Sequence, residues 1–514
     1  MDERAGRVYL VGAGPGAPDL ITVRGEQVLR RAEVVVYDYL ASSELLALAP
    51  PGAELIYAGK QGGSRSSIDQ AELNRILIEH ARAGRRVVRL KGGDPFIFGR
   101  GGEEAEALAA AAIAFEVVPG VTSATAAPAF AGIPLTHRKL ASFVAFLTAH
   151  RDETKDPRGN PVPWDELASA ARAGGTLVLL MASAQLRESL ARLAQQLPAA
   201  TPAAVVQWAT TAAQRSIVAT LATLAGEVES AGVGAPSVVV VGEAAALGAR
   251  LNWFERMPLY GRRIVITRAR AESGAFAAGL RALGAEVLEF PTIETAAPDS
   301  YAAIDAALER LASFDWVIFT SAAGVERLLE RMRTRGVDLR AMADAKLGAI
   351  GPVTAARLAE HALTVAALPR EYRAEAIIEA IGAARIRGAR ILIPRAQVAR
   401  EVLPEMLVAA GAREVVVAPV YKTVKPARAP TERVRDMAKA RAIDLVAFTS
   451  SSTVTNFREM VGAAVAHGLK AAAIGPITTE TARAAGIEVV VQPRDYTVPA
   501  LIDAIRDYFI TVNK

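Results

Sequence analysis

The feature that most constrains the fold is a short pattern that recurs along the chain: an apolar run, a Gly-containing turn, and an alanine-rich stretch. The runs are RVYLVGAG (7–14), AEVVVYD (32–38), RRVVRLKGGD (85–94), GTLVLLM (175–181), PSVVVVGE (236–243), RRIVITRA (262–269) and DWVIFTS (315–321). Such short, β-branched runs are typical of strands buried on both faces of mostly parallel sheets. Their alternation with helices predicts α/β architecture.

Length and composition further limit the number of domains and the class of protein. At about 150 residues per domain, 514 residues correspond to roughly three or four domains. A hydrophobic share of 52% and a charged share of 22% exclude a mostly disordered chain. Cysteine is absent, which excludes disulfides, iron–sulfur clusters and cysteine nucleophiles. The five histidines show no metal-ligand spacing, so we expect no metal.

The N-terminus, MDERAGRVYL, is charged and leads directly into a strand, unlike a signal peptide. No apolar run approaches the ~20 residues that a membrane span requires. We therefore expect a soluble, cytoplasmic protein that does not enter a membrane.

Charge is unevenly distributed, with a net −1 over residues 1–257 and +6 over residues 258–514. A basic half favours an anionic partner, either nucleic acid or a polycarboxylated or phosphorylated small molecule, although +6 is also an ordinary value. We expect no nucleic-acid partner, because there is no dense Lys/Arg run and aromatic residues are only 5%.

Two segments break the pattern. LNWFERMPLYGRR (251–263) separates two halves of similar length, and the polar loop 151–164 is a linker or a lid. The C-terminal half repeats itself, since 263–291, 314–329 and 347–363 match 390–419, 443–458 and 472–487. A repeat this long predicts two similar α/β lobes with a cleft between them.

The first candidate site is VGAGPGAPDLIT (11–22), a Gly-rich turn after a strand that lets a ligand approach the backbone. Gly12, Gly14 and Ala17 satisfy the dinucleotide pattern G-x-G-x-x-A, and Asp38 ends the next strand. Pro15 argues against a nicotinamide cofactor, because it lies where a helix should donate N–H groups to pyrophosphate. A tight turn without a ligand is the other alternative.

The second candidate is RLKGGDPFIFGRGGEE (89–104), which carries two glycine clusters. Two Gly-rich strand exits in one sheet favour a single ligand that bridges them. Asp94 either accepts hydrogen bonds from that ligand or caps the next turn.

With VVPGVTSAT (117–125) and AGIPLTHR (131–138), these blocks resemble uroporphyrinogen-III C-methyltransferases of the tetrapyrrole methylase family, over residues 7–254. The resemblance implies two α/β lobes, about 1–120 and 121–257, with S-adenosylmethionine (SAM) between them, and a homodimer. It replaces the nicotinamide interpretation. The positions that align with the family's SAM contacts are Pro15, Gly92, Gly93, Asp94, Ile97, Thr122, Ser123, Met181 and Ala209.

The resemblance also implies catalytic roles for two residues. Asp38 aligns with the family's proposed general base and Lys60 with a proposed proton donor. Alternatively, Asp38 only organises a strand end and Lys60 is a surface charge. Two departures bear on SAM binding: Ala17 replaces a common Asp, and QWAT (207–210) stands where the family commonly has E-N-G-T.

The C-terminal half, about 262–510, resembles uroporphyrinogen-III synthases. The motifs that carry the resemblance are VIFTSAAGV, AIGPVTAARLAE, ILIPRAQVAREVLPEML, VAPVYKTV, AFTSSSTVTNF, AIGPITTETA and RDYTVPALIDAI. The resemblance implies a discontinuous first lobe, about 262–294 plus 423–514, and a second lobe at about 295–422. Its substrate, hydroxymethylbilane, is a linear tetrapyrrole with carboxylate side chains, in keeping with the basic half.

Hydroxyls at strand–helix turns and arginines at matching repeat positions are candidates for binding those carboxylates. They are Arg268, Ser321, Arg395, Ser450, Ser451, Thr478 and Thr497, and any one of the hydroxyls can equally be a plain helix cap. Tyr421 is the candidate for assisting the leaving hydroxyl, or else a core tyrosine. No acid–base pair stands out.

The sequence therefore predicts a bifunctional enzyme of tetrapyrrole biosynthesis. Residues 258–514 would cyclise hydroxymethylbilane to uroporphyrinogen III, and residues 1–257 would methylate it at carbons 2 and 7 to precorrin-2, for sirohaem or cobalamin. The alternative is a methyltransferase whose C-terminal half only binds tetrapyrroles.

Overall fold

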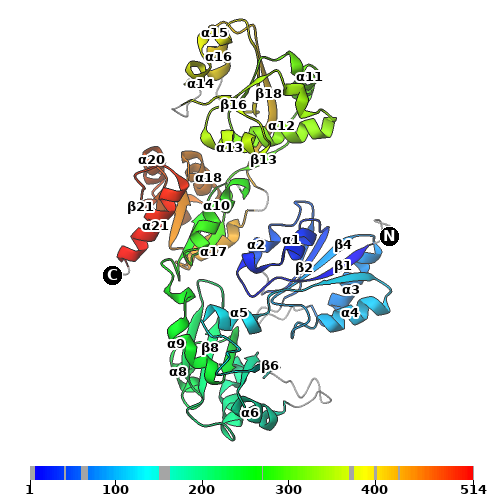
Figure 1. Cartoon of the computed structure of the whole chain (residues 1–514), viewed down its shortest axis with the longest axis vertical. Coiled ribbons are helices and arrows are strands. Elements are labelled where there is room, and N and C mark those ends of the chain that lie inside the picture. The colour runs from blue at the N-terminus through cyan, green and yellow to red at the C-terminus, as the bar shows by residue number, and fades with distance from the viewer. Residues whose placement is uncertain are drawn as a thin grey trace. The chain divides into compact units, whose positions relative to one another are not determined.

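The computed structural model describes residues 6–39, 42–59, 68–149, 162–268, 270–369, 376–398, 402–426 and 429–512. The chain forms two compact units, Met1–Phe290 with Pro430–Lys514, and Pro291–Ala429. The described residues form four sheets, each flanked by helices, and every apolar run that predicted a strand is one (Figure 1). In this part of the chain, no helix is long and apolar enough to cross a membrane.

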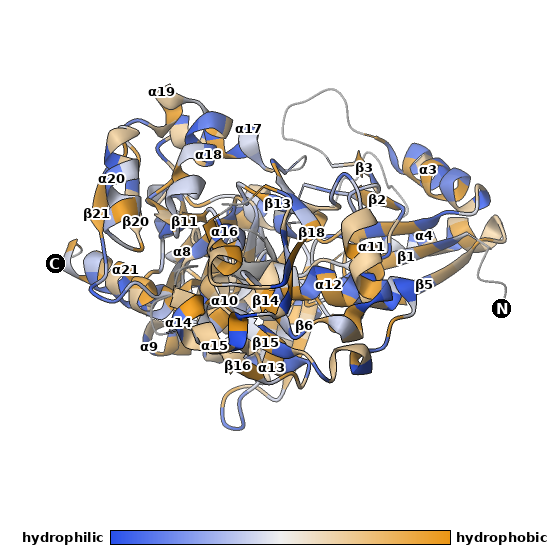
Figure 2. Ribbon diagram, turned by 90° about the horizontal axis from the view of Figure 1, so that it is seen from above, coloured by the Kyte–Doolittle hydropathy of each residue, from blue (hydrophilic) through white to orange (hydrophobic). Residues whose placement is uncertain are grey.

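The first sheet is entirely parallel and has the order β3-β2-β4-β1-β5. Its strands are β1 (Arg7–Gly12), β2 (Val34–Tyr37), β3 (Glu54–Tyr57), β4 (Arg86–Lys91) and β5 (Ala114–Val118). Crossover helices α1 (Val23–Leu29), α3 (Gln70–Arg82) and α4 (Gly101–Ala110) connect them. Helix α3 buries Leu73, Leu77 and Ala81 at four-residue spacing and carries several charged and polar residues on its other positions (Figure 2).

The second sheet differs from the expectation of mostly parallel strands. Its order is β6-β7-β10-β8-β9, and only the pair β6–β7 is parallel. The strands are β6 (Phe143–Thr148), β7 (Gly175–Leu180), β8 (Pro202–Gln207), β9 (Arg215–Thr220) and β10 (Ser237–Val241). The link from β8 to β9 is too short for a crossover helix, which forces antiparallel pairing. An apolar run buried on both faces does not encode strand direction.

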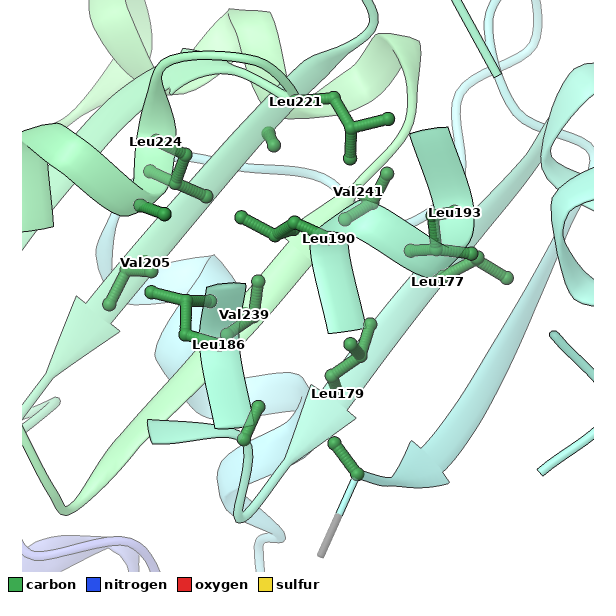
Figure 3. Close-up of a cluster of buried hydrophobic side chains, with 14 of the residues drawn as sticks. Leu177, Leu179, Leu186, Leu190, Leu193, Val205, Leu221, Leu224, Val239 and Val241 are labelled. Carbon is green, nitrogen blue, oxygen red and sulfur yellow. The ribbon is translucent and has the colours of Figure 1, made fainter. Parts of the chain in front are cut away.

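The core of this lobe lies between the second sheet and its helices. Leucines of β7 pack against α7 (Leu186–Ala194), whose Leu186, Leu190 and Leu193 point into the cluster (Figure 3). Residues spaced three and four apart share one helix face, so α7 presents a continuous apolar stripe to the sheet.

The internal repeat is a repeat of sheet topology. The third sheet has the order β12-β11-β19-β20-β21, and the fourth has β13-β18-β17-β14-β15-β16. The matching sequence segments place β11, β19 and β20 in correspondence with β17, β14 and β15, in the same spatial order. The strands of the third sheet are β11 (Arg263–Ile266), β12 (Glu286–Glu289), β19 (Leu445–Phe448), β20 (Lys470–Ala473) and β21 (Glu488–Val491).

The fourth sheet is parallel except for its edge strand β13, which runs antiparallel to β18. Its strands are β13 (Glu294–Ala296), β14 (Trp316–Phe319), β15 (Lys346–Ala349), β16 (Val365–Ala367), β17 (Arg390–Ala396) and β18 (Glu414–Val424). In both sheets, helices begin directly after the strands and bring their N-termini to the carboxyl edge. These helices are α12 (Ala322–Arg335), α13 (Pro352–Glu360), α18 (Ser451–Val461) and α20 (Pro476–Ala484).

Candidate functional sites

Three adjacent strands of the first sheet, β4, β1 and β5, end in glycine-rich loops that touch one another. Gly14 and Gly93 pair through reciprocal backbone hydrogen bonds, with N–O distances of 3.2 and 2.7 Å. A Cβ atom on Gly12 would lie 2.5 Å from the Cα of Gly120, and one on Gly120 would lie 2.3 Å from the Gly93 carbonyl oxygen. Only glycine fits there, so the loops expose bare backbone at the carboxyl edge of the sheet.

Asp94 holds two of these loops together. One carboxylate oxygen accepts a hydrogen bond from the Phe96 N–H at 2.8 Å, and the other accepts one from the Gly120 N–H at 2.9 Å. The predicted capping role of Asp94 is therefore present, together with a link to the β5 loop. Its predicted contact with SAM stays a prediction.

The second lobe faces these loops across a large cavity. The predicted SAM residues that line it are Pro15, Gly92, Gly93, Asp94, Ile97, Thr122, Ser123, Met181 and Ala209. Thr122 is the N-cap of α5 (Ser123–Phe130) and accepts from the Ala124 N–H at 3.3 Å. Met181 follows β7 and leaves 49% of its surface exposed. The structure thus brings all nine of these residues to one cavity.

Backbone strain is concentrated around this cavity. Of the described non-glycine residues with positive φ, four line it: Phe98, Met181, Trp208 and Thr210, at φ +52°, +55°, +47° and +69°. Left-handed backbone is costly for bulky side chains and persists where the surroundings enforce it. Such clusters are typical of binding sites. Met181 was a predicted SAM residue, but the positive φ of these four residues was not predicted, because φ is not readable from residue type alone.

Asp38 lies beside a buried charge cluster. A guanidinium nitrogen of Arg89 lies 3.6 Å from an Asp38 carboxylate oxygen. Glu104, 1% exposed, accepts from Arg89 Nε at 3.3 Å and from Lys91 Nζ at 2.7 Å. Burial and then the Arg89 cation lower the pKa of Lys91, against the opposing effect of Glu104. Asp38 is partly exposed but is not among the cavity-lining residues, and Lys60 lies outside the described residues.

The glycine turn does not lead into a helix, as a dinucleotide fold would require. After β1 the chain forms a 3₁₀ turn at Pro18–Leu20, and α1 begins only at Val23. Pyrophosphate bound at the turn would therefore meet no helix N-terminus there. Among the described residues, no group of three or more His, Asp or Glu side chains is arranged to hold a metal.

In the fourth sheet, the predicted residues gather on neighbouring strands. Ser321 ends the β14 turn, caps α12 by accepting from the Gly324 N–H at 3.1 Å, and lies 3.1 Å from the Tyr421 hydroxyl. Tyr421, on β18, is 8% exposed and packs in the lobe core. Arg395 is the last residue but one of the intervening strand β17 and is also buried. The ring of Tyr421 is therefore part of the core, as the alternative interpretation expected, and its catalytic role stays a prediction.

In the third sheet, the predicted residues follow four consecutive parallel strands, β11, β19, β20 and β21. Ser450 caps α18 by accepting from the Thr453 N–H at 3.4 Å, and Ser451 Oγ donates to the Ile477 carbonyl at 3.4 Å. Thr497 caps the last helix by accepting from the Ala500 N–H at 3.3 Å. Thr478 is buried in the first turn of α20. Arg268, just after β11, is partly exposed.

Two aromatic residues of the methylase cavity were not identified from the sequence. Tyr39 and Trp208 both line it, and their ring centroids are 6.4 Å apart. The sequence feature that could have identified Trp208 is the QWAT block (207–210), because it places a tryptophan within a block that the family commonly has as E-N-G-T.

The two halves match two known families. The model for tetrapyrrole (corrin/porphyrin) methylases matches residues 7–225, and the model for uroporphyrinogen-III synthase HemD matches residues 274–503. The matches and the fold define the class of protein: a tetrapyrrole methylase fused to a synthase-type domain.

One relative matches nearly the whole chain, and others match the methylase half alone. The porphyrin biosynthesis protein HemD of Ruminiclostridium josui is 35% identical over 505 residues, 97% of this chain and 97% of the relative. The SAM-dependent uroporphyrinogen III methyltransferase of Methanosarcina barkeri is 48% identical over 244 residues, 47% of this chain and 93% of the relative. A crystal structure of the Thermus thermophilus uroporphyrin-III C-methyl transferase complexed with S-adenyl homocysteine is 40% identical. It covers 47% of this chain and 100% of that chain, with a TM-score of 0.39. This chain belongs to the family of fused tetrapyrrole-biosynthesis proteins that HemD of R. josui represents.

Proposed function

We propose that this protein cyclises hydroxymethylbilane to uroporphyrinogen III and then methylates that product twice, at carbons 2 and 7, to give precorrin-2. The observation that carries the proposal is the convergence of the Gly14, Gly93 and Gly120 loops on one cavity, within a chain that also contains a synthase-type domain. The product would serve sirohaem or cobalamin synthesis.

The residues of the cavity fit SAM. Bare backbone at the glycine loops leaves room for a close-lying cofactor, and the exposed Met181 and Ile97 offer apolar surface. SAM, when bound, supplies an electrophilic methyl group on a sulfonium sulfur. The nucleophile is a pyrrole carbon of the porphyrinogen, which has enamine character and must lose a proton after methylation. Asp38 would accept that proton, and Arg89 holds its carboxylate in place.

In the synthase half, the proposed binding groups are helix N-termini and arginines. The N-cap residues of α13 and α20 are Gly351 and Gly475, each followed by proline and without a side-chain cap. Such N-termini offer N–H groups and partial positive charge to carboxylates. Arg268 and Arg395 would add charge-assisted bonds. Ring closure would then depend mainly on holding the linear substrate in a coiled shape.

A second candidate function is a methyltransferase whose C-terminal half binds tetrapyrroles without cyclising them. The buried position of Tyr421 and the engagement of its hydroxyl with Ser321 favour this alternative. Under either function we expect a homodimer formed through the methylase half, located in the cytoplasm, with no metal, nucleic acid or membrane required.

Supplying hydroxymethylbilane without SAM to the purified full chain separates the two functions. The proposed function predicts rapid formation of uroporphyrinogen III, whereas the alternative predicts only the spontaneous isomer I. Separate calorimetric titrations with SAM, NAD and NADP test the cofactor, and binding of SAM alone is the expected result.

A further inference from the structure

Tyr39 and Trp208 bridge the two lobes of the methylase half. Tyr39 follows β2 in the first sheet and Trp208 follows β8 in the second. Their rings meet edge to face, at a centroid separation of 6.4 Å and an interplanar angle of 66°. A second bridge lies beside them, where the Ala17 N–H donates to Thr210 Oγ1 at 2.9 Å. Two contacts between the lobes therefore come from one short segment, residues 208–210.

The backbone of this segment is held in a costly conformation. Trp208 and Thr210 both have positive φ, which bulky and β-branched side chains rarely adopt. Two hydrogen bonds maintain it: the Trp208 N–H donates to the Pro236 carbonyl at 3.1 Å, and the Thr210 N–H donates to Gln214 Oε1 at 2.9 Å. The indole of Trp208, held at this position, lines the cavity. Strain of this kind is typical of positions that serve binding.

Core packing does not account for the two rings. Tyr39 leaves 51% of its surface exposed, and Trp208 is only partly buried, although both line the cavity. Tyr39 follows β2, the strand next to β4, and so lies beside the three strands β4, β1 and β5 that end in the glycine-rich loops. The pair is therefore placed beside the proposed cofactor site, on the side where Asp38 follows the same strand.

We infer that the Tyr39–Trp208 pair is a binding surface for a pyrrole ring of the tetrapyrrole and sets the affinity for the methyl acceptor. This inference rests on the proposed methyltransferase function. Aromatic faces attract flat, electron-rich rings by stacking and edge contacts. In this inference the pair contributes to substrate binding, whereas Asp38 serves the methyl-transfer step.

The test uses Trp208→Asn in the full chain. Asn tolerates left-handed backbone, so this variant removes the indole without adding strain. We expect the Kd of uroporphyrinogen III, measured anaerobically by calorimetry without SAM, to rise about tenfold. The KM for uroporphyrinogen III should rise in parallel, while kcat and the Kd of SAM stay within about twofold.

Two further variants complete the test. Tyr39→Ala should weaken binding of uroporphyrinogen III, and the conservative variant Tyr39→Phe, which keeps the ring, should recover most of the affinity that Tyr39→Ala loses. Trp164→Phe, which alters a tryptophan packed against the core of the second lobe, is the matched control and should change neither Kd. An unchanged Kd for uroporphyrinogen III in Trp208→Asn, or an equal loss of SAM affinity, overturns the inference. A wild-type chain that does not methylate uroporphyrinogen III refutes the proposed function instead.

Discussion

A guanidinium nitrogen of Arg89 lies 3.6 Å from a carboxylate oxygen of Asp38, which directly follows β2. The same guanidinium pairs with the buried Glu104, so Asp38 is connected through Arg89 to a buried ion pair. Arg89 also donates to the carbonyl oxygens of Val36 and Leu90, at 3.4 and 3.3 Å. Its guanidinium is thus held by two strands and presents a positive charge to the Asp38 carboxylate.

We expect Asp38→Asn to reduce methyl transfer by about 100- to 10,000-fold, because a general base is lost. The affinity for SAM should change little, since Asp38 follows β2 and not one of the three strands that end in the glycine-rich loops. Single-turnover rates and SAM calorimetry provide the comparison. Asp69→Asn, which alters a surface helix cap on α3, is the control and should leave both values unchanged. Parallel losses of rate and SAM affinity would make Asp38 a binding residue.

In the synthase half, Tyr421→Phe should slow formation of uroporphyrinogen III by about 10- to 100-fold, less than the full loss of an acid catalyst can cost. The ring keeps its packing, and only the contact with Ser321 disappears. Isomer III should remain the main enzymatic product. Tyr301→Phe, at a tyrosine stacked under Arg331, is the control. Complete loss of isomer III with an unchanged circular dichroism spectrum would identify Tyr421 as an acid catalyst.

Arg268→Ala and Arg395→Ala should mainly raise the KM for hydroxymethylbilane, because anchoring of a carboxylate is the same in the ground and transition states. Arg395 is buried at the end of β17, so a thermal unfolding curve must accompany its kinetics. Arg340→Ala, at an exposed arginine paired with Asp338, serves as the control. A fall in kcat without a change in KM would show that either arginine acts on the reaction itself.

Glu44 predicts a pH dependence of stability. It pairs with Arg281, but burial raises its pKa to about 7, reinforced by Glu289 and opposed by Arg281. The folded state therefore holds this proton more tightly than the unfolded chain does. The resulting stabilisation is complete below the unfolded pKa and is lost as the pH rises to about 7.

Urea unfolding of the wild type and Glu44→Gln at about pH 5.5 and about pH 8.5 measures this effect. The stability of the wild type relative to the variant should be lower at the higher pH. The control is Glu26→Gln, which alters an exposed carboxylate paired with Arg30. A constant difference between wild type and Glu44→Gln would contradict the shift.

The sequence predicted the strands well because apolar, β-branched runs such as 236–243 have few alternatives to a buried strand. The resemblance to tetrapyrrole methylases placed Gly93, Asp94 and Thr122 at one site, and the structure brings these three residues to one cavity. The sequence did not predict the antiparallel pairing of β8 and β9, which depends on the length of their connection.

Charge pairing and backbone strain were also missed. Arg89 and Lys91 alternate within an apolar run, which signals a buried partner, but nothing near them in sequence identifies Glu104 as that partner. The contact between Tyr39 and Trp208 joins two lobes and involves the positive φ of Trp208, so no local sequence pattern predicts it.

The most direct test of the account is product analysis after one incubation of the purified full chain with hydroxymethylbilane and SAM under anaerobic conditions. The account predicts a dimethylated type III tetrapyrrole, precorrin-2, with two S-adenosylhomocysteines released per product. Methylation only when uroporphyrinogen III is supplied ready-made, with hydroxymethylbilane yielding isomer I alone, would contradict it.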